Sequence, residues 1–180
     1  MGEINKVYFQ ENETNDIEKL TDFNRKAHIF EHIKQSEEKH YTDATGYSMD
    51  RKFNIELKNR NQILLKNGKI SGCTQNGKSY IDDDIFIEDH KIADMMLDYI
   101  SYGLEPLYIN FLNNAIIIFN LSKLSIRPRK HLNMKINSKG YRAMEFANRQ
   151  GLFLKDAAIY DINYNLIKRC GEEWKTQQNS

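Results

Sequence analysis

The feature that most constrains this chain is a short segment in which apolar and polar side chains alternate strictly. Residues 53–58 read Phe-Asn-Ile-Glu-Leu-Lys, so that every second side chain is apolar. Successive side chains of a β-strand point to opposite faces of a sheet, and this pattern therefore predicts a strand with one apolar and one polar face. Such a strand needs a partner strand and a layer over its apolar face, which indicates a domain built around a sheet.

A partner strand is predicted just upstream, over residues 41–47, with a turn at residues 48–51. With two central residues in that turn, the antiparallel register places Asp43 directly opposite Glu56. Lys58 lies two residues beyond Glu56 and therefore projects from the same face. The hairpin thus predicts that two carboxyl groups and one ammonium group converge on one side of the sheet.

Periodic patterns predict the remaining elements. Apolar residues recur every three or four positions over 16–39 and 89–103, which predicts two amphipathic helices, the second ending at Gly103. Two strands are expected around the turn pair Asn113-Asn114. We further expect these strands at 107–112 and 115–121 and others at 62–65 and 158–167. Residues 85–87 form either a short buried strand or the entry to the next helix. A loop or loose hairpin is expected around Gly68, Gly72 and Gly77, and a helix at 141–150.

The predicted order is helix, three strands, helix and further strands. It favours an α/β fold with a mixed central sheet flanked by helices. The chain has 180 residues, about the size of one domain, and only 2 Pro and 9 Gly, so no low-complexity linker divides it. We expect a single domain with a core over about 16–121 and a C-terminal extension over about 122–180.

The sequence also bears on the cellular compartment. No stretch reaches the roughly 18–20 apolar residues that span a bilayer. The acidic N-terminus lacks the features of a signal peptide. The two cysteines, Cys73 and Cys170, lie far apart with no second Cys nearby, which argues against a disulfide framework or a zinc site. We therefore expect a cytoplasmic protein with no membrane partner.

The predicted cluster of Asp43, Glu56 and Lys58 has a definite chemistry. Two adjacent carboxylates repel each other, and a hard divalent cation such as Mg²⁺ or Mn²⁺ removes that repulsion. A bound cation lowers the pKa of a water molecule and stabilises negative charge on a phosphate. A lysine beside it can orient the water or stabilise the developing charge. These residue types at this spacing suit hydrolysis of a phosphodiester.

Asp43, twelve intervening residues and Glu56-Leu57-Lys58, between strand-like arms behind a helix, resemble the PD-(D/E)xK nuclease superfamily. The resemblance covers roughly residues 16–121 and implies a restriction endonuclease-like core of helix, three strands, helix and strand. It implies an endodeoxyribonuclease whose metal is held by Asp43, Glu56 and the carbonyl of Leu57, with Lys58 as the catalytic lysine. Glu31, on the first helix, is the candidate for an additional carboxylate that supports the first metal or binds a second one. The proline that often precedes the first Asp is Thr42 here.

Charge is segregated along the chain. Residues 51–80 hold seven Lys and Arg against the single acid Glu56, and residues 122–142 hold seven and no acid. Such segregation suits a surface that contacts a polyanion, although two solvated basic loops would produce the same pattern. We expect DNA as the partner. The candidate contacts to its backbone are Asn59, Arg60, Lys91, Arg127, Arg129 and Lys130.

Several alternatives stay open at this point. Asp50 competes with Asp43 as the first carboxylate, although Asp is common in turns for local hydrogen bonding. Asp82-Asp83-Asp84 is interpreted as a solvated acidic loop. An RNA-cleaving nuclease would use the same chemistry, and a non-catalytic nucleic-acid-binding or interaction module would reuse the same fold. A homodimer fits cleavage of both strands of a duplex, but nothing in the sequence indicates one directly.

Overall fold

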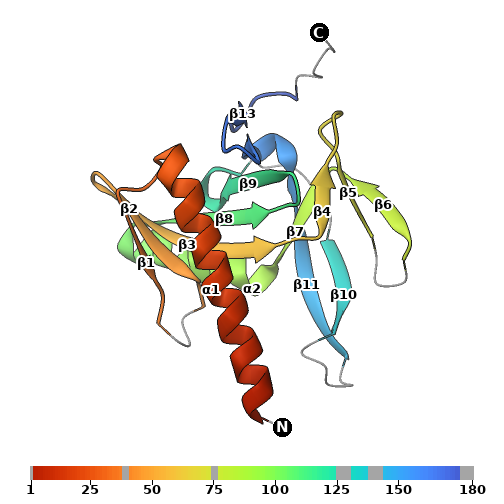
Figure 1. Ribbon diagram of the computed structural model, residues 1–180, viewed down its shortest axis with the longest axis horizontal. Helices are drawn as coiled ribbons and strands as arrows, with labels where there is room; N and C mark the ends of the chain where they lie inside the picture. The colour runs from red at the N-terminus through yellow and green to blue at the C-terminus, as the bar shows by residue number, and fades with distance from the viewer. Residues whose placement is uncertain (1, 38–40, 74–76, 125–130, 138–143, 175–180) are drawn as a thin grey trace.

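The computed structural model describes residues 2–37, 41–73, 77–124, 131–137 and 144–174. This part of the chain forms an α/β fold with one large mixed sheet, two small sheets and two helices (Figure 1). The helices are α1 (Gly2–Ala27) and α2 (Asp89–Tyr102), with short 3-10 turns η1 (Leu121–Lys123) and η2 (Leu154–Asp156). Within the described residues, neither helix combines the length and the apolar character needed to cross a membrane.

The large sheet has seven strands. Their spatial order is β1 (His32–Gln35), β2 (Ala44–Ser48), β3 (Arg51–Asn59), β8 (Leu104–Phe111), β9 (Ala115–Asn120), β12 (Ala157–Asp161) and β13 (Leu166–Lys168). Strands β3 and β8 run parallel, and every other neighbouring pair in this sheet is antiparallel. Because parallel neighbours cannot be joined by a tight turn, the chain makes a long crossover between them, and α2 is its last element.

The two small sheets both involve this crossover. One is the antiparallel meander β4 (Gln62–Leu64), β5 (Ile70–Cys73) and β6 (Ser79–Asp82). The other contains β10 (His131–Asn137), β11 (Met144–Phe153) and β7 (Asp84–Glu88), in that spatial order. Strand β11 therefore returns from late in the chain to pair with β7, immediately before α2.

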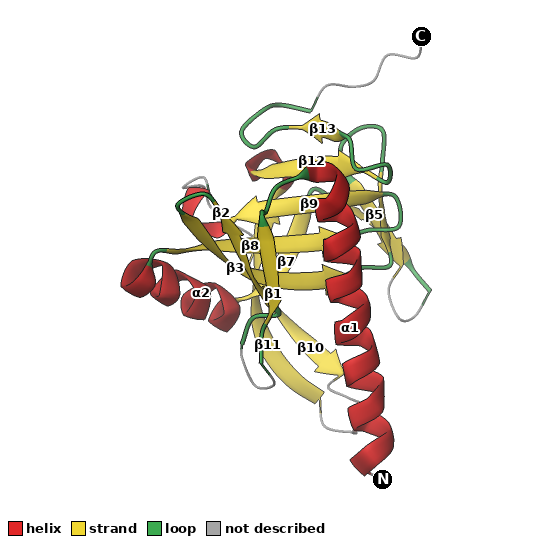
Figure 2. Ribbon diagram, turned by 60° about the vertical axis from the view of Figure 1, so that its left-hand side comes forward, coloured by secondary structure: helices red, strands yellow, loops and turns green. Residues whose placement is uncertain are grey.

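The helices cover opposite faces of the large sheet (Figure 2). On one face, Leu20 and Phe23 of α1 pack in a buried cluster with the apolar residues of β3, including Ile55 and Leu57. On the other face, Met95 of α2 belongs to a second buried cluster. The strict alternation along β3 thus places its apolar side chains under α1 and its polar ones on the face of α2. The predicted α/β class with a mixed sheet flanked by helices is confirmed at this level.

The predicted hairpin is confirmed with its register. Strands β2 and β3 pair from Ser48 with Arg51 to Ala44 with Ile55, around a two-residue turn. The left-handed backbone at Met49 (φ 48°) lies within that turn. The later hairpin of β8 and β9 and the end of α2 near Gly103 (φ 69°) also agree with the prediction.

The first helix is shorter at its C-terminal end than predicted. It ends at Ala27 rather than at residue 39, and His28 adopts a left-handed backbone conformation (φ 51°). The side-chain amide of Asn24 stabilises this exit, because it accepts from the N–H of Phe30 and donates to its carbonyl, each at 2.8 Å. Residues 32–35 then pair with β2 as a strand. Apolar residues at Phe30 and Ile33 continued the helical spacing by coincidence.

One further prediction is wrong in a related way, and one predicted strand is confirmed in a different sheet. The helix expected at 141–150 is replaced over its described residues by β11, which pairs with β7. The strand expected at 62–65 exists as β4, but it belongs to a small sheet rather than to the large one. The third strand of the large sheet that precedes α2 is instead β1, a segment that was predicted to be helical.

Candidate functional site

The carboxyl group of Asp43 is fixed at the point where β2 meets β3. The regular pairing ends at Ala44, and the backbone N–H of Asp43 donates to the carbonyl of Ile55 at 2.9 Å. One carboxylate oxygen, Oδ2, accepts the N–H of Leu57 at 2.6 Å. The carboxylate of Asp43 therefore accepts a hydrogen bond from β3 that a backbone carbonyl of the neighbouring strand would normally accept, and this bond holds the side chain against β3.

Glu56 lies beside Asp43 on the face of β3 that α2 covers. It is only 8% exposed, and the charge of Asp43 acts on its carboxyl group. The structure thus brings together the two acids that the hairpin register predicted to face each other.

Two lysines compensate this pair of acids. The Nζ atom of Lys91, from the first turn of α2, lies 2.9 Å from Oε2 of Glu56 and also donates to the carbonyl of Tyr41. Lys58 is exposed on the same face of β3, and its charge acts on both carboxyl groups. The site therefore combines two acids with two ammonium groups at the end of one strand.

Burial dominates the titration of the two acids. The pKa of Glu56 is raised to about 7, chiefly by burial and then by the neighbouring Asp43, while Lys91 and Lys58 oppose both effects. Burial also raises the pKa of Asp43, against the hydrogen bond from Leu57 and the charges of the lysines. The pair consequently retains a proton near neutral pH, at the place where a cation would compensate the same charge.

A small cavity of about 40 Å³ opens beside Glu56. It holds little more than a water molecule or an ion. Its charged lining comprises Glu56, Lys58, Arg60, Glu88, Lys91 and Arg149. Arg149 of β11 pairs with Glu88, the residue that precedes α2, with 3.3 Å between Nη2 and Oε1. The four cationic groups exceed the two carboxyl groups of this lining, which suits a phosphate oxygen.

Arg60 acts inside the protein as a brace. Its guanidinium donates to Oδ1 of Asn110, to the carbonyl of Phe86 and to the hydroxyl of Tyr108, each at 2.6 Å. These bonds join the end of β3 to β7 and β8. Arg60 was predicted to contact a nucleic-acid backbone, but its guanidinium already binds three acceptors within the protein.

A buried polar network holds the segment that precedes Asp43. Asn54, which is 1% exposed, donates to Oδ2 of Asp98 on α2 at 2.6 Å, and the Tyr41 hydroxyl donates to the same oxygen. The hydroxyl of Thr42 donates to the side-chain carbonyl of Asn54 at 3.1 Å. Since this network ties the segment to both β3 and α2, it fixes the direction from which Asp43 enters the site.

Other predicted site residues lie elsewhere. Glu31 is exposed beyond the end of α1, not on it, and its N–H donates to the carbonyl of Tyr47 at 2.8 Å. Tyr47 is four residues along the chain from Asp43, roughly 13 Å at about 3.3 Å per residue. Asn59 points to the α1 face, where its amide group binds Lys19 and Asp16. Glu31 and Asn59 therefore do not join the two carboxyl groups.

The alternative carboxylates also lie apart from this cluster. Asp50 is exposed in the turn between β2 and β3, at the far end of the hairpin from Asp43. Asp82, Asp83 and Asp84 bring ligand atoms within 4.8 Å of one another, because Asp83 forms a bend between β6 and β7. The interpretation as a solvated acidic loop therefore fits the exposed Asp83 but not Asp84, which is buried. The predicted contacts Arg127, Arg129 and Lys130 lie outside the described residues.

Sequence reasoning missed Glu88 and Arg149 as members of the site. The position of Glu88 directly before a helix was a usable signal, but Arg149 reaches it only through the pairing of β7 with β11. Comparison with known proteins adds no further residue, since no family model, no curated protein and no solved structure matches this chain. The function is therefore inferred from the chemistry of the site itself.

Proposed function

We propose that this chain is a metal-dependent nuclease of the PD-(D/E)xK type that hydrolyses phosphodiester bonds of DNA. One observation carries the proposal: the buried carboxyl groups of Asp43 and Glu56 lie close enough to act on each other electrostatically, beside the ammonium groups of Lys58 and Lys91. Burying two acids together is costly, and a bound divalent cation would offset that cost more fully than the two lysines do alone.

The donor set fits a hard cation such as Mg²⁺ or Mn²⁺. Carboxylate oxygens are the ligands that both ions prefer, and the backbone carbonyl of Leu57, between Glu56 and Lys58, would supply a third oxygen. Two protein groups, the N–H of Leu57 and the ammonium of Lys91, already orient the carboxyl groups. When bound, the cation supplies an acidified water and charge compensation on the phosphate.

The remaining residues have separate roles in this proposal. Lys58 would position the attacking water or stabilise negative charge on the phosphate, because it is exposed yet close to both acids. Lys91 orients Glu56 through their ion pair. Arg149 would bind a phosphate oxygen from the wall of the small cavity, with Glu88 holding its guanidinium in place.

The order of elements supports the same reading. Helix α1, strands β1, β2 and β3, helix α2 and strand β8 follow one another, apart from the small meander and β7 inserted before α2. This is the order of helix, three strands, helix and strand that the resemblance implies for a restriction endonuclease-like core. Glu56 lies on β3, and Asp43 directly precedes β2.

The proposal is tested by cleavage of plasmid DNA, branched DNA and RNA in the presence of Mg²⁺ or Mn²⁺. We expect Glu56→Gln and Lys58→Ala to lower the cleavage rate about 10²- to 10³-fold, the usual loss when one group that stabilises transition-state charge is removed. Glu31→Gln is the matched control, because Glu31 is exposed and lies away from the site. Its rate should equal that of the wild type.

The same assay separates the alternatives. Cleavage of RNA alone, lost in both site variants, would retain the chemistry and change the substrate. Salt-sensitive binding of DNA without any cleavage would favour a non-catalytic module on this fold. Equal cleavage by the wild type, Glu56→Gln and Lys58→Ala would remove this site from consideration.

A further inference from the structure

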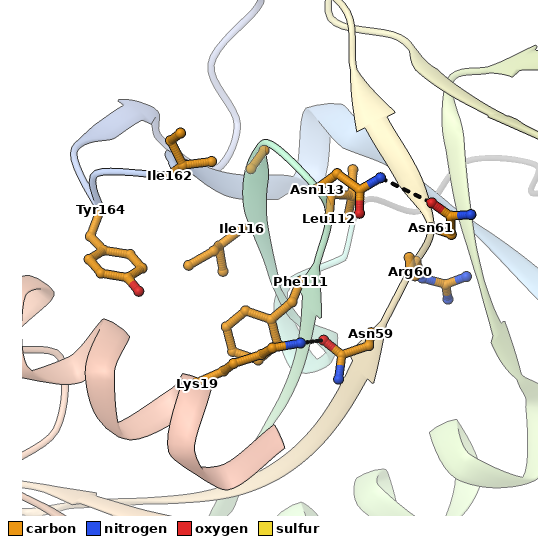
Figure 3. A pocket seen from close by; sticks show the side chains of 11 residues that line it. Lys19, Asn59, Arg60, Asn61, Phe111, Leu112, Asn113, Ile116, Ile162 and Tyr164 are labelled. Carbon is orange, nitrogen blue, oxygen red and sulfur yellow. Dashed lines mark hydrogen bonds between the residues drawn. The ribbon is translucent and has the colours of Figure 1, made fainter. Parts of the chain in front are cut away.

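A second and larger pocket lies on the opposite face of β3 from the two acids. It occupies about 390 Å³ between the end of β3, the turn that joins β8 to β9, and α1. Figure 3 shows Ile116, Ile162 and Tyr164 along one side of this pocket. Phe111 and Tyr164 also line the pocket. Its apolar wall therefore includes two aromatic rings.

The opposite side of the pocket is polar. The Nζ atom of Lys19 donates to Oδ1 of Asn59 at 2.6 Å, and Nδ2 of Asn113 donates to Oδ1 of Asn61 at 3.0 Å (Figure 3). A carboxamide offers two donors and an acceptor with two lone pairs, so these single bonds leave further capacity on Asn61 and Asn113. The pocket therefore combines aromatic rings, amide groups and one ammonium group.

These groups match the parts of a nucleotide. A base has flat faces that stack on aromatic side chains, and its edges carry the donors and acceptors that Asn recognises. The ammonium of Lys19 would compensate a phosphate. The volume lies within the range of small-molecule sites, and pockets at the carboxyl ends of parallel strands, here β3 and β8, are the usual ligand sites of α/β sheets.

The position of the pocket connects it with the proposed metal centre. Lys58 and Asn59 are consecutive residues of β3 and point to opposite faces, so the pocket and the two acids lie on either side of one strand end. We infer that this pocket binds one unpaired nucleotide of a single-stranded nucleic acid, with its base against Tyr164 and its phosphate near Lys19. The choice of a nucleic-acid chain as the ligand rests on the proposed function.

The inference is tested by fluorescence anisotropy with a short labelled oligothymidylate at constant salt, in EDTA so that no hydrolysis occurs. We expect Lys19→Gln, which removes the phosphate contact, and Asn113→Asp, which changes a contact to the base edge, each to weaken binding about tenfold. The matched controls carry the same charge changes at exposed positions outside the pocket: Lys34→Gln on β1 and Asn67→Asp in the loop between β4 and β5. Both controls should change the affinity less than about twofold.

An abasic oligonucleotide of equal length and thymidine monophosphate complete the experiment. The abasic chain should bind the wild type several-fold more weakly, and Asn113→Asp should affect its binding no more than the matched Asn control does. Equal affinity for the abasic chain, or equal losses in pocket and control variants, would overturn the inference. So would thymidine monophosphate that binds as tightly as the oligonucleotide, because the pocket would then serve a free nucleotide.

Failure of this inference is distinguishable from failure of the proposed function. Pocket variants that bind normally, while Glu56→Gln abolishes cleavage, would discard the nucleotide pocket alone. Pocket variants that lose binding, while Glu56→Gln cleaves like the wild type, would discard the metal centre and retain the pocket.

Discussion

Glu56 is a carboxyl group that the fold removes almost completely from water. Its pKa of about 7 means that the folded protein binds a proton there over a range of pH in which the unfolded chain, with a value near 4.5, has released it. A raised folded-state pKa contributes stability that is fully present below pH 4.5 and is lost as the pH rises through 7. The loss of stability that follows ionisation of Glu56 can therefore be measured from the free energy of unfolding at different pH values.

We expect the free energy of unfolding of the wild type to fall by about 3 kcal/mol between pH 4.5 and pH 8, from this group alone. Glu56→Gln replaces the acid with a neutral group of the same shape, so its stability should vary much less over the same range. Urea denaturation at several pH values measures both slopes. Identical slopes for the two proteins would show that Glu56 titrates normally.

Individual residues also show which contacts of the site can be predicted from the sequence. The pairing of Asp43 with Glu56 followed from the turn length and the two-residue period of a strand, which are local properties. The involvement of Lys91 in an ion pair with Glu56 depends on how α2 packs over the sheet. That placement is set by tertiary contacts, so the sequence separation between positions 56 and 91 does not predict it.

At the level of elements, the errors share one cause. Strand β1 and strand β11 were both predicted to be helical, and both are strands because a distant segment pairs with them. Pattern alone does not separate a short apolar segment of a helix from a strand that a partner stabilises. Elements with local signals at their ends, such as Gly103 after α2, were predicted correctly.

The contact between β2 and the chain after α1 provides a test of packing. A Cβ atom at Gly46 would lie 2.7 Å from Cδ1 of Phe30, so an alanine there would force the phenyl ring to move. We expect Gly46→Ala to lower the free energy of unfolding by about 1–3 kcal/mol, the usual cost of overpacking a core. The midpoint of urea denaturation measures this loss.

A double-mutant cycle identifies the contact responsible. Phe30→Ala removes the ring atoms that the new methyl group would meet, so Gly46→Ala should cost less in that background, by about 1 kcal/mol or more. Additive effects of the two substitutions would show that the loss arises elsewhere than at Phe30.

For the molecule as a whole, binding of a divalent cation should appear as stabilisation. Mn²⁺ at a concentration a hundredfold above its dissociation constant would add about 2.7 kcal/mol, which raises the melting temperature of a chain of this size by roughly 5–10 °C. The increase should be larger at pH 8 than at pH 6, because protons compete with the cation for Asp43 and Glu56. Calorimetry at the two pH values measures the difference.

Two aspartate variants determine where the cation binds. Asp43→Asn should abolish the stabilisation by Mn²⁺. Asp83→Asn, in the exposed acidic bend between β6 and β7, makes the same chemical change and should leave it intact. The reverse result would assign the cation to the bend and contradict the proposed centre.

The alternation along β3 has a consequence for how this chain can change in length. Lys58 and Asn59 serve opposite sides of the sheet, and a strand rotates every following side chain by half a turn when a single residue is inserted or deleted. An insertion or deletion of one residue within residues 51–59 would exchange the neighbours on the two faces of β3. It would turn the ammonium group of Lys58 toward the apolar layer beneath α1. Lineages of this protein should therefore vary in the loops around this ribbon while holding its residue count constant.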